Sequence, residues 1–205
     1  MIRMKRRALL LLASACLAAC SKRKTAARQA LPAGSVVLAL GDSITFGTGA
    51  APEAAYPAQL AELTGWKVIN GGVPGDTSAQ VLARTPALLA EHQPALVILS
   101  AGGNDFLRRV PDAETEANLR QTVKAMSDTG AQVLLVAVPR PTLVAALGAG
   151  PTDHPLYEKL AAELVLPLHV GGWARVLGDE KLKSDQIHAN AAGYREFAQG
   201  LAAPR

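Results

Sequence analysis

The sequence predicts a single α/β domain: a three-layer α/β/α sandwich with a mostly parallel sheet of five strands. Five short apolar runs show little alternation of polar and apolar residues, as is typical of parallel strands buried on both faces. Segments with the period of amphipathic helices separate these runs, and this βαβα order favours helices on both faces of the sheet. A composition of 49% hydrophobic and 19% charged residues excludes a disordered chain.

The predicted strands are short and rich in leucine or β-branched residues. They comprise residues 35–40, 66–69, 95–99 and 132–138, with a weaker fifth run at residues 165–170. The helical patterns cover residues 56–63, 78–91, 113–129, 155–164 and 191–201; Gly130 stops the third helix, and Asn190 is a candidate cap for the last. Aromatic residues make up only 4% of the chain, so we expect alanine and leucine to fill the core.

Residues 1–19 have the pattern of a bacterial lipoprotein signal peptide. Four positive charges within residues 3–7 precede an apolar stretch, residues 8–19, which at 12 residues is too short to span a bilayer. The stretch ends before Cys20 in small residues that resemble a lipobox, the signal for lipidation of the cysteine. We expect Cys20 to be the lipidated first residue of the mature chain. The alternative is an ordinary cleaved signal with incidental cysteines.

Residues 20–34 are expected to form the lipidated cysteine and a tether, and residues 35–205 the folded domain. Several acyl chains suffice for stable attachment to a membrane. In the bacterial system that the lipobox resembles, Ser21 rather than aspartate after the cysteine indicates the outer membrane. We therefore expect the chain to be anchored on the periplasmic side of a bacterial membrane, the outer one by this criterion. We also expect it to be a monomer.

The net charge of +4 belongs to the N-terminal region. Eight of the 21 basic residues precede Gln29, which leaves 13 basic against 17 acidic residues in the rest of the chain. An acidic folded domain lacks the electrostatic basis for binding nucleic acid, so we expect no such partner.

The loop after the first predicted strand, residues 41–47, places Ser43 among small residues and just before a candidate helix start. At the carboxyl end of a buried strand, a serine exposes its hydroxyl where backbone N–H groups face the same space, which suits a nucleophile. The alternative is that Asp42 or Ser43 only caps a turn or helix. The spacing differs from the G-x-S-x-G elbow of α/β-hydrolases, because the next glycine is Gly47.

Two glycine-rich loops, residues 70–77 and 101–105, follow the second and third predicted strands. Glycine lets the backbone approach a ligand closely, and we expect unpaired N–H donors where the first loop enters the helix near Ser78. Taken alone, each loop is also typical of an ordinary connector. Neither contains the nucleotide-binding motifs G-x-G-x-x-G or G-x-x-x-x-G-K-[ST].

Near the C-terminus, Asp185 and His188 have the spacing of an acid and base pair. A carboxylate three residues before the histidine can accept the imidazole Nδ1–H, which leaves Nε2 to take a proton from a serine. A surface or capping role is the alternative for His188. Three other histidines lack such an acid and are interpreted as structural: His92, His154 and His169. No cysteine pair, H-E-x-x-H motif or histidine cluster offers a metal site, so we expect neither metal nor cofactor.

Four motifs resemble, in order, the four blocks of the SGNH (GDSL-type) esterase/lipase family. They are Gly-Asp-Ser at 41–43, a glycine after the second strand, Gly-Gly-Asn-Asp at 102–105 and Asp-x-x-His at 185–188. The resemblance extends over residues 35–201 and is greatest to the bacterial periplasmic acyl-CoA thioesterase/lysophospholipase/arylesterase type. It implies a flavodoxin-like SGNH hydrolase fold, with Ser43 as nucleophile, His188 as base and Asp185 as its orienter. It also implies an oxyanion hole formed by the N–H groups of Ser43 and Gly75 and the side-chain amide of Asn104.

The resemblance predicts a serine esterase or thioesterase that hydrolyses acyl-CoA, lysophospholipid or aryl esters through an acyl-enzyme and without a cofactor. The alternatives are an O-acetyl esterase acting on cell-wall or polysaccharide sugars and a non-catalytic binding lipoprotein of the envelope. We expect the acyl group to lie along Phe106, Leu107 and the apolar run at residues 141–147. The sequence departs from the usual family pattern at Pro74, Gln186 and Ala189, which bears on loop geometry and substrate range rather than on the reacting groups.

Overall fold

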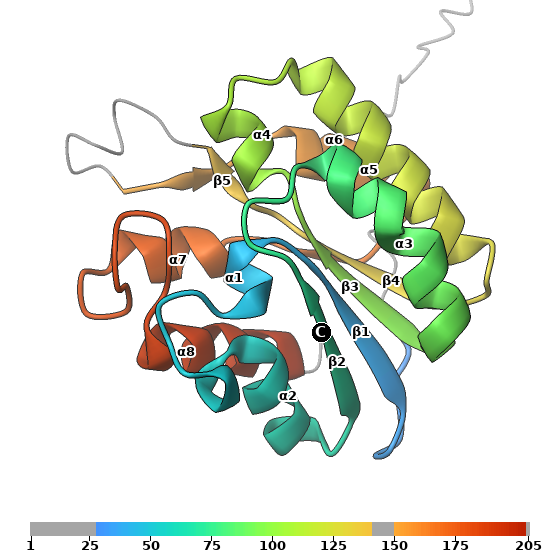
Figure 1. The fold of residues 1–205 in the computed structure, drawn as a ribbon, viewed down its shortest axis with the longest axis horizontal. Coiled ribbons are helices and arrows are strands. Elements are labelled where there is room, and N and C mark those ends of the chain that lie inside the picture. Colours follow the sequence, from blue (N-terminus) through green and yellow to red (C-terminus); the bar gives the residue numbers. More distant parts are fainter. Residues whose placement is uncertain (1–27, 141–149, 204–205) are drawn as a thin grey trace, which may run out of the picture.

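The structure, a computed structural model, describes residues 28–140 and 150–203, which form an α/β fold around one five-stranded sheet (Figure 1). The strands are β1 (Val36–Gly41), β2 (Lys67–Gly72), β3 (Leu96–Ser100), β4 (Gln132–Val136) and β7 (Leu168–His169). Their order in the sheet is β2-β1-β3-β4-β7, and every neighbouring pair is parallel. The predicted parallel sheet is therefore confirmed.

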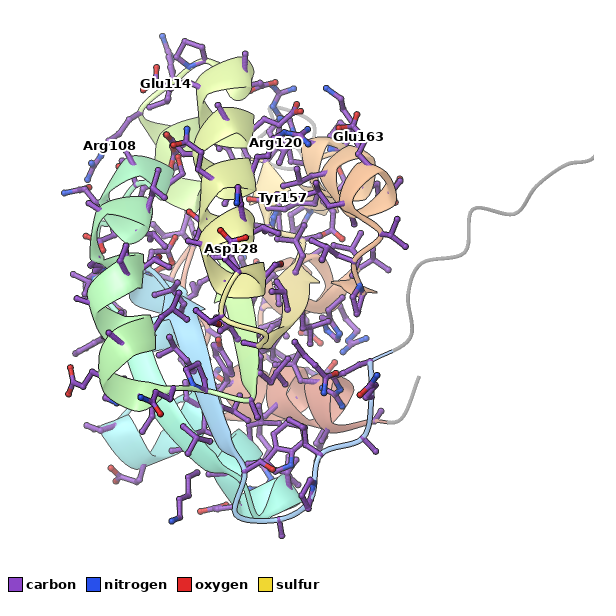
Figure 2. The ribbon with its side chains drawn as sticks, turned by 90° about the vertical axis from the view of Figure 1, so that its right-hand side faces the viewer. Arg108, Glu114, Arg120, Asp128, Tyr157 and Glu163 are labelled. Atoms are coloured by element: carbon purple, nitrogen blue, oxygen red, sulfur yellow. The ribbon has the colours of Figure 1, made fainter. Side chains whose placement is uncertain are left out.

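Helices cover both faces of the sheet, which confirms the three-layer prediction (Figure 1). One layer contains α2 (Tyr56–Thr64), α7 (Gly172–Gly178) and α8 (Ala191–Ala202). The other contains α3 (Ser78–His92), α5 (Asp112–Ser127) and α6 (Leu156–Leu164). Figure 2 views this second layer, in which Arg120 on α5 donates a hydrogen bond of 2.6 Å to Glu163 on α6.

The last strand is shorter than its apolar run predicts. Val165 ends α6 in the left-handed region, at φ 53°, and Pro167 follows it without an N–H to donate. Residues 165–167 therefore form the exit from a helix, and pairing with β4 begins only at Leu168.

Aromatic side chains contribute more to the core than their small number predicts. Trp173 stacks on Phe197 at a centroid distance of 3.6 Å, and Tyr56 packs edge-on against Phe197 at 5.0 Å. The largest fully buried side chains include these three together with Tyr157 and Tyr194. Leucine and alanine fill the sheet as expected, but the expectation that they fill most of the core was wrong for the layer of α2, α7 and α8.

Several short elements were not predicted because they contain too few residues to show a period. They are α1 (Ser43–Phe46), the 3-10 turn η1 (Pro52–Ala54), α4 (Gly103–Leu107), α7, and the antiparallel pair β5 (Pro139–Arg140) and β6 (Thr152–Asp153). Among the helices within residues 28–140 and 150–203, none has the length and apolar character needed to cross a membrane.

The strand order fixes where a ligand can bind. The sheet has the flavodoxin-like order, in which the chain passes from β1 outward to β2 and then back to β3 on the other side. Ligands of such sheets bind at the carboxyl ends of the two strands that flank this switch. In this chain those strands are β1 and β3, and they lead directly into Ser43 and Asn104.

Candidate active site

The turn after β1 presents Ser43 at the first position of α1. Asp42 is the cap of this helix, and its carboxylate accepts a hydrogen bond from the N–H of Ile44 at 3.2 Å. The turn needs glycine at position 41, because a Cβ there would lie 2.2 Å from the carbonyl oxygen of Ser100. Asp42 thus supplies the cap and leaves the hydroxyl of Ser43 for other contacts.

A closed loop carries the acid and base pair. An antiparallel bridge joins Lys183 to Ala189 at the base of this loop. The next residue, Asn190, caps α8 by accepting a hydrogen bond from the N–H of Gly193 at 3.0 Å. The predicted cap is therefore confirmed, and it ties the loop to the start of a packed helix.

Within this loop Asp185 holds His188 through both carboxylate oxygens. Oδ1 accepts from the N–H groups of Ile187 and His188, each at 2.8 Å, and Oδ2 lies 2.7 Å from Nδ1 of His188. Nε2 of His188 lies 2.9 Å from Oγ of Ser43, which is 145 residues away in sequence. The structure thus brings the three residues of the predicted triad into one hydrogen-bonded chain.

Asp185 is suited to remain ionised. Desolvation by itself would raise the pKa of its carboxyl, but the hydrogen bonds from the His188 ring and from the N–H groups of Ile187 and His188 outweigh it, and the pKa is lowered. The side chain of Asp185 is 53% exposed and that of His188 14% exposed. A negative carboxylate therefore faces the imidazole on the side away from Ser43.

Gly75 lies at the third position of a tight turn. The N–H of Asp76 donates to the carbonyl of Val73 at 3.2 Å, and Gly75 has φ +83°. A turn of this kind, type II, favours proline at its second position and glycine at its third, as Pro74 and Gly75 provide. The departure from the family pattern at Pro74 is thus compatible with the turn.

The predicted oxyanion donors lie on adjoining segments. The side-chain amide of Asn104, on α4, donates to the carbonyl oxygen of Asp76 at 3.0 Å, so that it adjoins the turn at Gly75. Ser43 and Asn104 line the same pocket. No acceptor within the described parts of the chain pairs with the N–H groups of Ser43 and Gly75. Two backbone donors are thus available for a ligand oxygen.

At the start of α3 the N–H groups of Thr77, Ser78 and Gln80 are paired within the protein, so the expectation of unpaired donors holds at Gly75 in the loop rather than at Ser78 itself. Thr77 and Gln80 cap this helix reciprocally. The buried carboxylate of Asp105 accepts from the N–H of Ser78 at 2.7 Å and also from its hydroxyl. Because these three donors are paired within the protein, they have a structural role.

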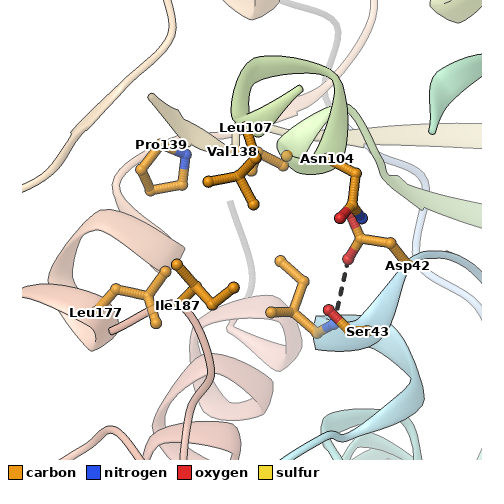
Figure 3. A pocket seen from close by; sticks show the side chains of 10 residues that line it. Asp42, Ser43, Asn104, Leu107, Val138, Pro139, Leu177 and Ile187 are labelled. Atoms are coloured by element: carbon orange, nitrogen blue, oxygen red, sulfur yellow. Dashed lines mark hydrogen bonds between the residues drawn. The ribbon is translucent and has the colours of Figure 1, made fainter. Parts of the chain in front are cut away.

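A mostly apolar pocket opens beside Ser43 (Figure 3). It encloses about 440 Å³ of space, part of which is continuous with solvent. Its lining residues are Asp42, Ser43, Ile44, Gly103, Asn104, Leu107, Val138, Pro139, Leu177 and Ile187. Figure 3 shows Leu177 and Ile187 facing Val138 and Pro139 across this space.

The pocket differs in part from the groove that the sequence predicts. Leu107 lines it as expected, whereas Phe106 stacks on His154 at a centroid distance of 4.4 Å instead. Residues 141–147 lie outside the described residues. Two lining residues were not predicted: Leu177, on the short helix α7, and Ile187. The position of Ile187 next to His188 could have indicated it.

The other three histidines lie away from this site. His154 is buried, its Nδ1 accepts from the N–H of Leu156 at 3.2 Å, and burial lowers its pKa. His169 packs edge-on against Phe197, and His92 ends α3. Within residues 28–140 and 150–203, no group of three or more histidine, cysteine or acidic side chains could hold a metal ion.

Asp42 is the unusual ionisable group of the pocket. Its side chain is 3% exposed, and burial raises its pKa to about 7, assisted by the negative charges of Asp105 and Asp76 and opposed by its hydrogen bond from Ile44 and by His188. Between about pH 4 and pH 7 the folded chain therefore holds a proton that the unfolded chain has lost. The free energy of unfolding then decreases as the pH rises through this window.

Asp42→Asn should remove this pH dependence, because the amide oxygen still caps α1 and carries no charge. We expect the stability of the variant relative to the wild type to increase by up to about 1.4 kcal/mol per pH unit between pH 4 and 7, and to level off above pH 7. Urea unfolding of both proteins at several pH values measures this difference. Asp128→Asn, at an exposed position at the C-terminal end of α5, is the control. A constant difference in stability between Asp42→Asn and the wild type would contradict the raised pKa.

The chain is similar to known proteins in sequence and in fold. The model of the GDSL-like Lipase/Acylhydrolase family matches residues 39–196. Thioesterase 1/protease 1/lysophospholipase L1 of Escherichia coli K12 is 37% identical over 163 residues, which is 77% of each chain. Esterase TesA of Pseudomonas aeruginosa is 40% identical over 136 residues, covering 64% of this chain and 65% of that protein. A crystal structure of TesA has a TM-score of 0.70 and 30% identity, and covers 81% of this chain and 95% of that chain.

Proposed function

This chain belongs to the GDSL-like lipase/acylhydrolase family and is a hydrolase of ester bonds, and we propose that it works through a triad of Ser43, His188 and Asp185. The observation that carries the proposal is the continuous chain of contacts from Asp185 through His188 to Oγ of Ser43, at 2.7 and 2.9 Å. Ester hydrolysis by such a triad requires no cofactor.

In the first half of the reaction, Oγ of Ser43 attacks the carbonyl carbon while Nε2 of His188 takes its proton. The carbonyl oxygen becomes negative, and the N–H groups of Ser43 and Gly75 with the amide of Asn104 donate to it. His188 then gives the proton to the departing alcohol or thiol as its bond to the carbonyl carbon breaks. The products of this half are the free leaving group and an ester of Ser43.

In the second half, water attacks the acyl-enzyme and gives one proton to His188, which returns it to Oγ of Ser43 as the acid departs. Asp185 accepts the Nδ1–H of the ring throughout. Its negative charge stabilises the imidazolium that forms in each half, in keeping with the lowered pKa of its carboxyl.

The lining of the pocket favours substrates with an apolar acyl group. None of its side chains is a lysine or arginine. Six are aliphatic or proline: Ile44, Leu107, Val138, Pro139, Leu177 and Ile187. Leu107 and Ile187 are 46% and 42% exposed, so an acyl chain beside Ser43 would cover them. We propose aliphatic or aryl esters and thioesters as substrates, in preference to acetylated sugars.

A panel of substrates together with a serine-reactive probe tests this function. We expect a fluorophosphonate to label the wild type at Ser43, and p-nitrophenyl esters with acyl chains longer than acetyl to have a higher kcat/KM than the acetate. Acyl-CoA and lysophospholipid in the same panel identify the leaving group. Absence of labelling would identify a binding protein, and a preference for acetylated sugars over every acyl ester would refute the proposed substrate class.

Asn104→Ala tests the oxyanion hole. A donor of this kind strengthens its bond as charge develops on the oxygen, so its removal should lower kcat by about 10² to 10³ with little change in KM. Asn104→Asp should lower kcat further than Asn104→Ala above the pKa of the new carboxyl, because a like charge would face the oxyanion. A normal kcat with a lowered melting temperature would assign Asn104 only to its contact with Asp76.

Cys20 lies outside the described residues, and we propose its lipidation from the lipobox alone. Labelled palmitate should enter the wild type and not Cys20→Ser when both are produced in a bacterium. Label retained by the variant would refute both the anchor and the membrane location drawn from it.

A further inference from the structure

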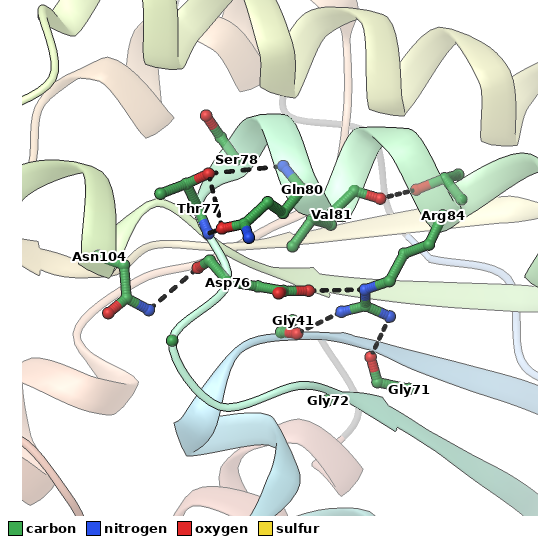
Figure 4. Close-up of polar contacts among 12 residues, drawn as sticks. Gly41, Gly71, Gly72, Asp76, Thr77, Ser78, Gln80, Val81, Arg84 and Asn104 are labelled. Carbon is green, nitrogen blue, oxygen red and sulfur yellow. Dashed lines mark hydrogen bonds and ion pairs between the residues drawn. The ribbon is translucent and has the colours of Figure 1, made fainter.

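The guanidinium of Arg84 joins three chain segments behind the catalytic site (Figure 4). Its Nε donates to Oδ2 of Asp76 at 2.7 Å. Its two terminal nitrogens donate to the carbonyl oxygens of Gly71 and Gly41, at 2.6 and 2.7 Å. These contacts come from one helix, α3, and end on β1, on β2 and on the loop between β2 and α3.

Two of these contacts, at Gly41 and Asp76, lie close to proposed oxyanion donors. Gly41 is two residues before Ser43, and Asp76 directly follows Gly75. The carbonyl of Asp76 accepts the side-chain amide of Asn104, so its position also sets where that amide lies. We propose that Arg84 is a positioning residue for the oxyanion hole, which it aligns through Gly41 and Asp76; this inference rests on the proposed function.

The chemistry of the side chain suits this role. Arginine presents several donors in a rigid planar fork, whereas lysine has a single ammonium on a flexible stem. The carbonyls at Gly41 and Gly71 belong to neighbouring parallel strands, and a planar fork can reach both while Nε still meets Asp76. Arg84 does not line the pocket, and its side chain is 23% exposed against 10% for Asp76. It therefore acts on the reaction through the backbone rather than by contact with substrate.

The test measures kcat and KM with a p-nitrophenyl ester for Arg84→Lys and Arg84→Met. Small displacements of preorganised donors are costly, so we expect kcat to fall about 10-fold for the lysine variant and about 100-fold for the methionine variant, with KM nearly unchanged. Arg120→Met is the matched control, because Arg120 forms ion pairs with Glu116 and Glu163 on the outer surface of α5 and α6 (Figure 2). Its kcat should equal that of the wild type.

Coupling to Asn104 separates positioning from simple stabilisation. If Arg84 acts through the oxyanion hole, Arg84→Lys should lower kcat by a much smaller factor in an Asn104→Ala background than in the wild type. Arg84→Met leaves the carboxylate of Asp76 without its ion-pair partner, which can prevent folding. In that case the double variant Asp76→Asn/Arg84→Met, which also removes the charge of Asp76, is measured instead of Arg84→Met.

Two results would overturn the inference. The first is that Arg84→Lys lowers the melting temperature but keeps the wild-type kcat per folded molecule. The second is that Arg84→Lys lowers kcat by the same factor in the wild type and in the Asn104→Ala background. Failure of the proposed function is distinguishable, because then the wild type and Arg120→Met would also neither hydrolyse the ester nor react with the fluorophosphonate.

Discussion

Ser43→Ala should abolish turnover and fluorophosphonate labelling while leaving the fold intact. Loss of the nucleophile of a triad costs about 10⁶ in kcat, because the histidine and the carboxylate then have no group to activate. The melting temperature should hardly change, since Asp42 rather than Ser43 supplies the cap of α1, and the hydroxyl of Ser43 has His188 as its partner. Purified variant and wild type are compared by ester hydrolysis, by labelling and by a melting curve.

Ser127→Ala is the matched control for this substitution, because Ser127 is an exposed serine at the end of α5. It should keep full activity and labelling. Activity of Ser43→Ala above a few per cent of the wild type would remove Ser43 from the role of nucleophile. If Ser43 were only a cap, the variant would instead lose about 1 kcal/mol of stability and keep its activity.

The sheet could be predicted because its strands carry a strong local signal. Burial on both faces selects continuous apolar runs, and β1 and β3 are buried along nearly all of their length. The five longest helices could be predicted for the same reason, since each has several turns over which the period is visible. The helices α1, α4 and α7 have 4, 5 and 7 residues, too few for a period, and tertiary contacts decide their ends.

The candidate site could be predicted only in part from local spacing. The contact between Asp185 and His188 spans three residues, so the spacing itself indicates it. The contact of His188 with Ser43 depends on the topology, which brings the ends of β1 and of a late loop together, and it was expected from the order of the family blocks. These two kinds of signal were enough for the groups proposed to react.

The supporting residues gave no such signal. Arg84 lies in an amphipathic helix, where an arginine ordinarily indicates a solvated position, and its role depends on two carbonyl groups whose positions only the folded sheet defines. Leu177 likewise belongs to a short helix and reaches the pocket only through the packing of α7 against α8. Side chains that act through distant backbone atoms therefore need the structure to be identified.

Asp185→Asn should lower kcat by about 10³ to 10⁴ with little change in KM or in the melting temperature. The N–H groups of Ile187 and His188 both donate to one oxygen of this side chain, so the amide must keep its oxygen on that side and turn its NH₂ toward Nδ1 of His188. Nδ1 must then accept, which places the ring proton on Nε2, where it faces Ser43 and cannot take the proton of the hydroxyl. The imidazolium also loses its negative partner. Ester hydrolysis by the variant, with Asp128→Asn as an exposed control, measures the effect; a kcat within a few-fold of the wild type would mean that another group orients His188.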